Sequence, residues 1–134
     1  MTRLATSFTR RGDLIVVRPA VRGPRGTFRG IFLLDTGAAV TTMTHDFAGK
    51  IGYGVHDGLR PTTVRTAVGA EHGYVLRVAA FTALGFTVAD LEINTFDLDH
   101  DIDGLIGMNF LIQFNYDVRS LERRILVEPA QPGA

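Results

Sequence analysis

The sequence predicts a single all-β domain that contains one or two short helices. Short apolar runs rich in β-branched residues recur along the chain, as expected for buried strands. Fifteen glycines separate these runs and supply the turns between them. Apolar residues at helical spacing occur only in two brief stretches. A length of 134 residues with 46% hydrophobic residues is enough for one domain, 1–134, with a packed core.

The first elements are two strands joined as a hairpin. Residues 14–17 form a short apolar run, and a second apolar run covers residues 28–34. The turn residues Gly23-Pro24-Arg25-Gly26 lie between the runs. The second run ends at Asp35-Thr36-Gly37, so a buried strand leads directly into a polar loop.

A strand over 39–43 and a helix over 45–51 follow. Thr44 has the side chain of an N-cap, and Asp46 lies in the first helical turn, where a negative charge is favourable. Gly52 ends the helix. Residues 53–61 are rich in glycine and polar residues and are expected to form a loop.

A long hairpin is predicted next, with strands over 62–67 and 74–81. Its turn is the glycine-bounded segment 68–73, which is expected to be a mobile tip. Leu84-Gly85-Phe86 then turns into a strand over 87–95.

The last part contains an acidic loop, 97–103, and several short elements. The short elements are a strand at 105–106, a helical turn over 107–112, a final hairpin of 114–118 with 125–127, and a flexible tail, 129–134.

Composition excludes several classes of function. Fourteen basic residues balance fourteen acidic residues, which argues against nucleic acid or an anionic membrane as the main partner. The chain has no cysteine, so it contains no disulfide and no thiolate metal site. No apolar run is long enough to cross a membrane, and the N-terminus lacks the apolar centre of a signal peptide. We therefore expect a cytoplasmic protein, with a trimmed membrane anchor as the remaining alternative. Thirteen arginines against one lysine suggest a GC-rich genome, and thus a bacterial source.

Charge is uneven along the chain. Residues 1–30 carry seven arginines and one aspartate, whereas residues 90–117 carry six aspartates, one glutamate and no arginine or lysine. One interpretation is that the basic stretch is an arm that binds an acidic partner. The other is that the basic and acidic stretches face each other or are simply solvated.

Asp35-Thr36-Gly37 is the first motif that could carry chemistry. An aspartate at the end of a wholly apolar strand is costly to bury unless it is hydrogen-bonded or functional. Thr36 offers a hydroxyl to lock the loop, and Gly37 lets the backbone approach a ligand closely. An ordinary Asx turn at a strand end explains the same three residues equally well.

A second motif lies about 70 residues further along the chain. Residues 103–111, Asp-Gly-Leu-Ile-Gly-Met-Asn-Phe-Leu, place two apolar residues before a glycine and a short helix. Alone it is a common strand-to-helix turn. The two motifs in this order and at this spacing are far more specific than either one.

Together, residues 33–38 and 104–111 resemble the retropepsin-like aspartic proteases, a single-domain family that includes retroviral proteases and their cellular relatives. The resemblance covers about residues 12–128. It implies a closed β-barrel protomer, a homodimer and hydrolysis of peptide bonds without a cofactor or metal ion. By resemblance, Asp35 is the catalytic residue. The other implied site residues are Thr36, Gly37 and Ala38 in the active-site loop and dimer lock; Val68, Gly69, Ala70 and Ile106 against the substrate; and Gly107 and Asn109 in structural roles.

Two departures from the viral pattern agree with each other. Met108 stands where retroviral members have an arginine, and Ala39 and Val40 stand where its acidic partner is found. The chain is therefore more similar to cellular members. Glu71 and His72 also make the flap more polar than a glycine-rich viral flap, which changes the expected substrate preference.

A count of catalytic groups determines the expected assembly. Aspartic proteolysis needs two carboxylates that share one proton. This chain has one Asp-Thr-Gly and is too short for two lobes, so a twofold homodimer has to supply the second Asp35. Residues 3–9 and 124–128 are candidates for interleaving between the two chains. The bound protein or peptide substrate would be extended under the flap.

Two other interpretations compete with a protease. The same fold could be a catalytically silent dimerisation or peptide-binding module. Alternatively, Asp99-x-Asp101-x-Asp103-Gly104 matches the first half of a calcium-binding loop, with Ile106 at the usual apolar position. Phe110 stands where such a loop needs a bidentate glutamate, which weakens the match. The four histidines do not have the spacing of a zinc hydrolase.

Overall fold

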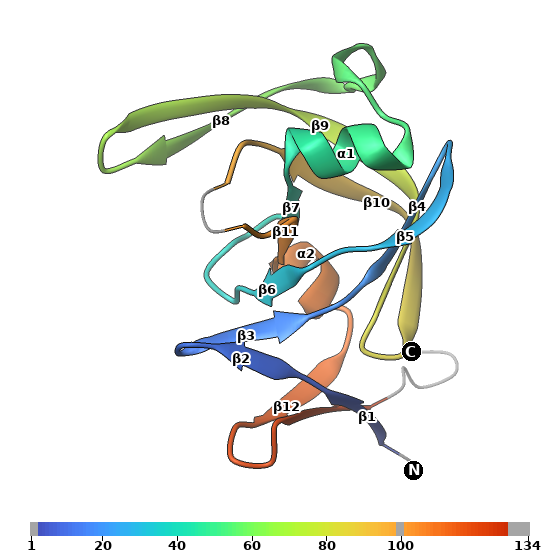
Figure 1. Cartoon of the computed structure of the whole chain (residues 1–134), viewed down its shortest axis with the longest axis vertical. Coiled ribbons are helices and arrows are strands. Elements are labelled where there is room, and N and C mark those ends of the chain that lie inside the picture. The colour runs from blue at the N-terminus through green and yellow to red at the C-terminus, as the bar shows by residue number, and fades with distance from the viewer. Residues whose placement is uncertain (1–2, 99–100, 129–134) are drawn as a thin grey trace.

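The computed structural model describes residues 3–98 and 101–128. Two α-helices, one 3-10 turn and short strands make up this part of the chain (Figure 1). The strands are β1 (Leu4–Ser7), β2 (Thr9–Arg11), β3 (Leu14–Val17), β4 (Ala20–Gly23), β5 (Gly26–Arg29), β6 (Phe32–Leu34), β7 (Thr42–Met43), β8 (Arg60–Thr66), β9 (Gly69–Ala83), β10 (Phe86–Thr95), β11 (Gly104–Ile106), β12 (Asn115–Arg119) and β13 (Arg124–Glu128). The helical elements are α1 (His45–Ile51), η1 (Val55–Asp57) and α2 (Met108–Leu111).

The strands form one large and one small sheet. The large sheet runs in the order β2-β3-β6-β11-β7-β10-β9-β4-β5, and β8 pairs with β9 outside this path. The small sheet has the order β1-β13-β12. At the centre of the large sheet, β11 runs parallel to β6, and β10 runs parallel to β7. The predicted all-β fold with two short helices is confirmed.

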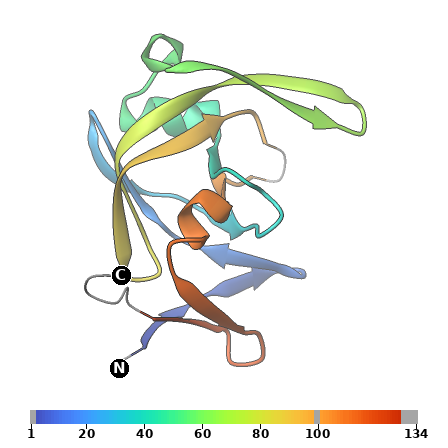
Figure 2. The same cartoon turned by 180° about the vertical axis from the view of Figure 1, so that it is seen from behind.

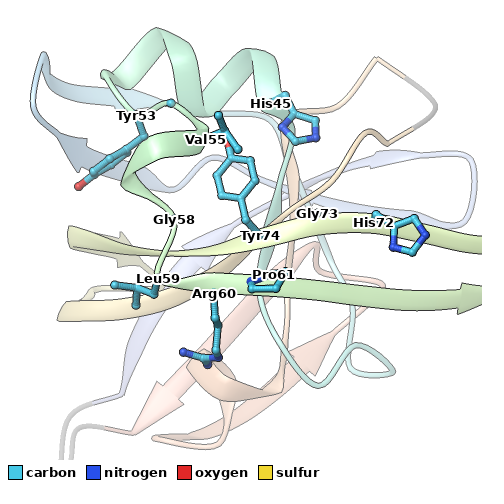
Figure 3. A pocket seen from close by; sticks show the side chains of 11 residues that line it. His45, Tyr53, Val55, Gly58, Leu59, Arg60, Pro61, His72, Gly73 and Tyr74 are labelled. Atoms are coloured by element: carbon cyan, nitrogen blue, oxygen red, sulfur yellow. The ribbon is translucent and has the colours of Figure 1, made fainter.

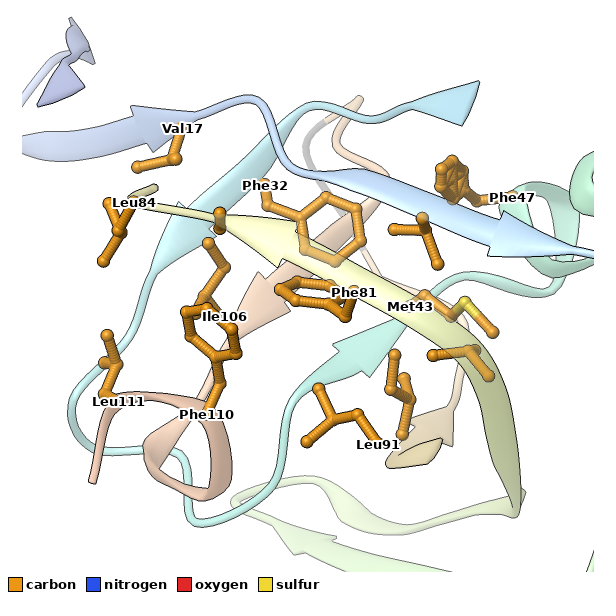
Figure 4. Packing of buried hydrophobic residues seen from close by; sticks show 14 of the residues in the cluster. Val17, Phe32, Met43, Phe47, Phe81, Leu84, Leu91, Ile106, Phe110 and Leu111 are labelled. Atoms are coloured by element: carbon orange, nitrogen blue, oxygen red, sulfur yellow. The ribbon is translucent and has the colours of Figure 1, made fainter. Parts of the chain in front are cut away.

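The core is built around a chain of phenylalanine rings. Phe32 contacts Phe47 and Phe81 edge-on, at centroid distances of 5.7 and 5.8 Å. Phe81 continues the chain to Phe110 at 5.1 Å. Figure 4 shows these rings between the strands, with Met43 and aliphatic side chains around them. Because the rings come from β6, β9, α1 and α2, the core fixes the ends of the elements that carry both sequence motifs.

Helix α1 begins and ends where the sequence predicted. The Thr44 hydroxyl accepts a hydrogen bond from the Phe47 N–H at 3.1 Å, as an N-cap does. Gly52 adopts the left-handed conformation with φ 108° and ends the helix. Phe47 and Ile51 are buried on one face, so the amphipathic reading of this segment is confirmed.

The first predicted hairpin is wrong in its choice of strands. β4 pairs with β5 around the turn at residues 24–25, whereas residues 14–17 pair with β2 and β6. The apolar run 28–34 is divided at Gly30. β5 ends at Arg29 and β6 begins at Phe32. A Cβ at Gly30 would lie 2.6 Å from the Phe32 ring, so a larger residue would need this buried ring to move.

The turn of the long hairpin is shorter than predicted. β8 and β9 pair from Arg60↔Val75 to Thr66↔Gly69, which leaves a two-residue turn at Ala67 and Val68. Glu71 and His72 therefore lie within β9 and not in the turn. Two smaller corrections concern neighbouring segments, since the strand predicted over 39–43 covers only Thr42–Met43 and the predicted loop 53–61 contains η1.

The small sheet joins the two ends of the described chain. β13 lies between β1 and β12, with Leu4 opposite Val127 and Tyr116 opposite Val127 on the other side. Both edges of β13 are thus paired within one chain, so interleaving of 124–128 with a second chain would have to displace β1 or β12. The predicted tail, 129–134, lies outside the described residues.

Within residues 3–98 and 101–128, no helix is long and apolar enough to span a bilayer.

Candidate active site

Asp35 lies directly after β6, beside the end of β11. Its N–H donates to the carbonyl oxygen of Ile106 at 2.9 Å, which continues the parallel β6–β11 ladder by one residue. The chain then turns away from the sheet as the loop 35–41, which projects on the same side as the β8–β9 hairpin in Figures 1 and 2. The strand ladder therefore sets the position of the Asp35 backbone.

The loop is closed by hydrogen bonds to Asp35 itself. The Gly37 N–H donates to Asp35 Oδ1 at 3.0 Å, and the Ala38 N–H donates to the Asp35 carbonyl at 3.2 Å. Asp35 and Ala38 are half-buried, whereas Thr36 and Gly37 are exposed. The turn thus orients the carboxylate and presents the next two residues to the surface.

Asn109 joins the loop to the second motif. Its Oδ1 accepts hydrogen bonds from the N–H and the hydroxyl of Thr41, both at 2.8 Å. Its Nδ2 donates to the Glu92 carbonyl of β10 at 2.7 Å. The Thr41 hydroxyl in turn accepts from the Gly107 N–H at 3.0 Å. One amide side chain therefore ties loop 35–41, β10 and the start of α2 together.

The start of α2 supports the loop through its backbone as well. The Met108 N–H donates to the Ala38 carbonyl at 2.8 Å, and the Asn109 N–H donates to the Ala39 carbonyl at 3.0 Å. These two donors lie in the first turn of the helix, where no intrahelical acceptor exists for them. The two sequence motifs therefore satisfy each other's backbone groups.

Met108, the departure noted in the sequence, faces a tyrosine. The Tyr116 hydroxyl donates to the Met108 sulfur at 4.0 Å. The contact links α2 to β12 through a weak sulfur hydrogen bond.

The β8–β9 hairpin extends over the loop side of the molecule (Figure 1). Val68 lies in its turn with 95% of its surface exposed, and the neighbouring Gly69 and Ala70 are exposed too. Three of the predicted substrate-binding residues therefore lie at the tip of this hairpin.

Ile106 is placed differently. It is fully buried in the main core cluster, beneath the loop. The side chain presents no surface to a ligand in this structure. It supports the ladder at Asp35, while a wall of a substrate pocket has to come from other residues.

A cavity of about 810 Å³ lies at the base of the hairpin, on the side of α1 and η1 (Figure 3). Tyr74, His72 and Pro61 line it from the hairpin, and His45 lines it from the start of α1. The His45 and Tyr74 rings are 5.5 Å apart. Burial raises the pKa of the Tyr74 phenol, and the negative charge of Asp57 adds to the effect. Asp35 is not among the residues that line this cavity.

The other face of the hairpin base carries an ion pair. The Arg60 guanidinium donates two hydrogen bonds to the Glu92 carboxylate, at 3.0 and 3.2 Å. These bonds hold the pKa of Glu92 below its usual range, and the charges of Arg60 and Arg77 contribute further. The hairpin is thus fastened to β10 at the residue whose carbonyl receives Asn109.

Replacing Arg60 with glutamine is expected to return the Glu92 pKa towards its usual range. Because the pKa is lowered in the folded protein, the pair stabilises the fold above the usual carboxyl pKa, and this contribution is lost as the pH falls through the lowered value. A carboxyl NMR titration measures the shift. Arg22→Gln, at an exposed arginine of β4, is the control and should leave Glu92 unchanged. A Glu92 pKa that stays equally low in Arg60→Gln would show that another group causes the shift.

One carboxylate that the calcium interpretation needs already has a hydrogen-bond partner within the chain. Asp103 Oδ2 accepts a hydrogen bond from the Ile31 N–H at 2.7 Å, which ties the start of β11 to the start of β6. The Asp101 carbonyl lies 3.5 Å from the Arg11 guanidinium. Asp99 lies outside the described residues. Among the residues that are described, no three histidine, aspartate or glutamate side chains come together as a metal site.

Two residues near the site, Thr41 and Val64, were not predicted from the sequence. Thr41 is fully buried and uses both its N–H and its hydroxyl to hold the loop. Val64 is an exposed apolar side chain on the hairpin, at 41%. The only sequence signal for Val64 is its alternation with polar neighbours in β8, whereas Thr41 gives no local signal.

Comparison with known proteins identifies the family. The family model described as aspartyl protease matches residues 24–110, a range that contains Asp35-Thr36-Gly37 and all of the second motif except its last residue, Leu111. The chain belongs to the aspartyl protease family. The crystal structure of a retropepsin-like aspartic protease from Rickettsia conorii is similar to this family member, with a TM-score of 0.70 and 18% identity over 94% of this chain and 98% of that chain.

A second solved structure has the same fold. The retroviral protease-like domain of Ddi1 from Leishmania major matches with a TM-score of 0.60 and 14% identity, over 87% of this chain and 90% of that chain. The comparison with curated protein sequences gave no match. The retropepsin-like fold predicted for this aspartyl protease family member is therefore confirmed.

Proposed function

We propose that this aspartyl protease family member is an aspartic endopeptidase that works as a homodimer. Each chain gives one Asp35 to a pair of carboxylates, and the pair activates a water molecule to hydrolyse a peptide bond. The proposal places the enzyme in the cytoplasm. It needs no cofactor, because the two carboxylates supply both the general base and the general acid.

The observation that carries this proposal is the interlocked Asp35 loop. Asp35 is fixed by β11, closed by Gly37 and supported by Asn109 through Thr41. A carboxylate needs this degree of restraint to act on a water molecule at a fixed position. The neighbouring Thr36 and Gly37 are exposed, which suits contact with the same loop of a second chain.

In the proposed reaction, two Asp35 carboxylates share one proton. The ionised carboxylate removes a proton from water, and the resulting oxygen nucleophile attacks the peptide carbonyl. The protonated carboxyl gives its proton to the carbonyl oxygen, which leaves a tetrahedral intermediate with two hydroxyl groups. When this intermediate collapses, the C–N bond breaks. The carboxyl that took the proton from water gives it to the leaving amine nitrogen, and the other carboxylate takes back a hydroxyl proton, so the pair again holds one proton. Two carboxyl groups that share one proton repel each other strongly when both are ionised. The two pKa values therefore belong to the pair and not to either residue.

The substrate of the proposed enzyme is an extended polypeptide under the β8–β9 hairpin. Val68, Gly69 and Ala70 at the tip would contact it, and the exposed backbone of Gly69 would meet it at close range. An extended peptide fits because its backbone can hydrogen-bond to neighbouring strands.

The test is cleavage of an unbiased peptide mixture from about pH 3 to about pH 7, read by mass spectrometry. We expect the rate per chain to rise with protein concentration over the range in which sedimentation shows dimers forming, since only a dimer holds two Asp35 residues. Cleavage by a species that sediments as a monomer would contradict the proposal.

A second candidate is a catalytically silent dimerisation or peptide-binding module. The similarity to a protease-like domain of Ddi1 favours keeping it. A protein that sediments as a dimer and binds peptides, but cleaves none of them at any pH, would support this candidate over the enzyme.

A further inference from the structure

We propose that Glu71 selects a basic side chain, arginine or lysine, in the peptide bound beneath the hairpin. This inference rests on the proposed function and names the substrate class of the same site.

The register of β8 and β9 divides the hairpin into two faces. Thr62 is opposite Gly73, and Val64 is opposite Glu71. Side chains of paired residues point to the same face, and the face alternates along a strand. Arg60, Thr62, Val64 and Glu71 therefore share one face, while the residues between them lie on the other.

The second face borders the cavity, whose lining also includes Arg60 and Gly73 at the hairpin base. Tyr74 and His72 line it, and the His72 ring bonds the Thr63 hydroxyl at 3.2 Å across the strands. In Figure 3, Tyr74 projects towards α1, and Arg60 projects to the opposite side of the hairpin. The face with Glu71 is thus turned away from α1 and η1.

We take the first face to be the one turned towards loop 35–41. Arg60 reaches Glu92 on this side, and the Glu92 carbonyl receives Asn109, which holds Thr41 of the loop. Glu71 lies on this inner face, nearer the tip. Figures 1 and 2 both show the hairpin extending on the same side as loop 35–41. A peptide held between hairpin and loop would therefore pass beneath Glu71.

The chemistry of this inner face favours a cation. Arg60 is already bonded to Glu92, and the exposed Glu71 forms no ion pair with the residues that the structure describes. Val64, directly opposite Glu71, is an exposed apolar side chain. An arginine or lysine can lay its alkyl stem on Val64 and place its charge at the Glu71 carboxylate. An acidic peptide side chain would meet repulsion there instead.

The test uses two peptides that differ at one residue, arginine or its uncharged analogue citrulline, placed at each position around a cleavage site found with the peptide mixture. At one position we expect kcat/KM to favour arginine by about threefold to tenfold, the range of a single partly exposed ion pair. Glu71→Gln should remove this preference, and Glu71→Lys should reverse it towards a glutamate peptide. The change should fall mainly on KM, since Glu71 touches no reacting atom.

A matched control moves the carboxylate to the other face of the same strand. Glu71→Gln combined with Ala70→Glu restores the net charge but places the acid away from the peptide. We expect the arginine preference to stay lost in this double variant. A recovered preference would mean that overall charge, and not the position of Glu71, selects the substrate, and the inference would be overturned.

A binding measurement separates this inference from the proposed function. The Asp35→Asn protein is titrated with fluorescent arginine and citrulline peptides, with and without Glu71→Gln. Tighter binding of the arginine peptide that depends on Glu71 supports the inference even if no variant cleaves. Equal Kd values for the two peptides overturn it, while cleavage by the wild-type protein would leave the proposed function standing.

Discussion

The Asp35→Asn protein is expected to lose at least about 10³-fold in kcat/KM, because in the proposed dyad an amide can neither accept a proton from water nor share one with a second Asp35. The fold should survive. Asn Oδ1 can still accept the Gly37 N–H that Asp35 Oδ1 accepts at 3.0 Å, so the free energy of unfolding is expected to change by less than about 0.5 kcal/mol. Peptide cleavage and thermal unfolding, measured on the same preparation, check both statements.

Mixing the two proteins tests whether a site needs both chains. If wild-type chains exchange with a ninefold excess of Asp35→Asn chains, activity per wild-type chain should fall to about one tenth, since most wild-type chains then have an inactive partner. Asp13→Asn, at an exposed turn aspartate, is the control and should leave activity intact. Full activity in the presence of excess Asp35→Asn would contradict a shared site.

Gly107→Ala is expected to destabilise the fold by about 3 kcal/mol or more and to inactivate the protein. A Cβ there would lie 2.7 Å from the Val40 carbonyl carbon and 2.8 Å from the Thr41 nitrogen. Both atoms are backbone, so no side-chain rotation relieves the conflict. Denaturant unfolding gives the loss in stability, and loop 35–41 should be displaced because it contains Val40 and Thr41.

Gly49→Ala is the matched control for this substitution. Gly49 lies within α1, and a Cβ there meets nothing within 4 Å. Alanine is the better helix former, so the variant should be more stable by about 0.5–1 kcal/mol. If Gly107→Ala unfolded at the wild-type denaturant concentration, the packing of α2 against the loop would not be needed for the fold.

Features that depend on neighbouring residues could be predicted from the sequence. The limits of α1 follow from Thr44, Phe47 and Gly52, which are close enough along the chain to be recognised together. The Asp35 motif followed a run of apolar residues that could only be a buried strand. The pairing of the two motifs came from their resemblance to a family, and the structure explains it by the bonds from Asn109 to Thr41.

Features that depend on distant residues could not be predicted. The run 28–34 is divided at Gly30, where a Cβ would meet the rings of Phe32 and the distant Phe47. The turn consists of Ala67 and Val68 alone because β8 pairs with β9 along its whole length. Gly69 and Gly73, which lie within β9, make the sequence predict a longer turn. The burial of Ile106 depends on its place among all the strands of the core.

The pairing of β1 with β13 has a consequence for how the protein forms. The Arg3–Glu128 hydrogen bond joins residues 125 positions apart, and the whole ladder between these strands spans a similar separation. Closing so large a loop costs entropy that no nearby contact offsets, which makes such pairings slow. During synthesis, β1 leaves the ribosome long before β13 exists. The nascent chain therefore carries an unpaired N-terminal strand until β13 has emerged.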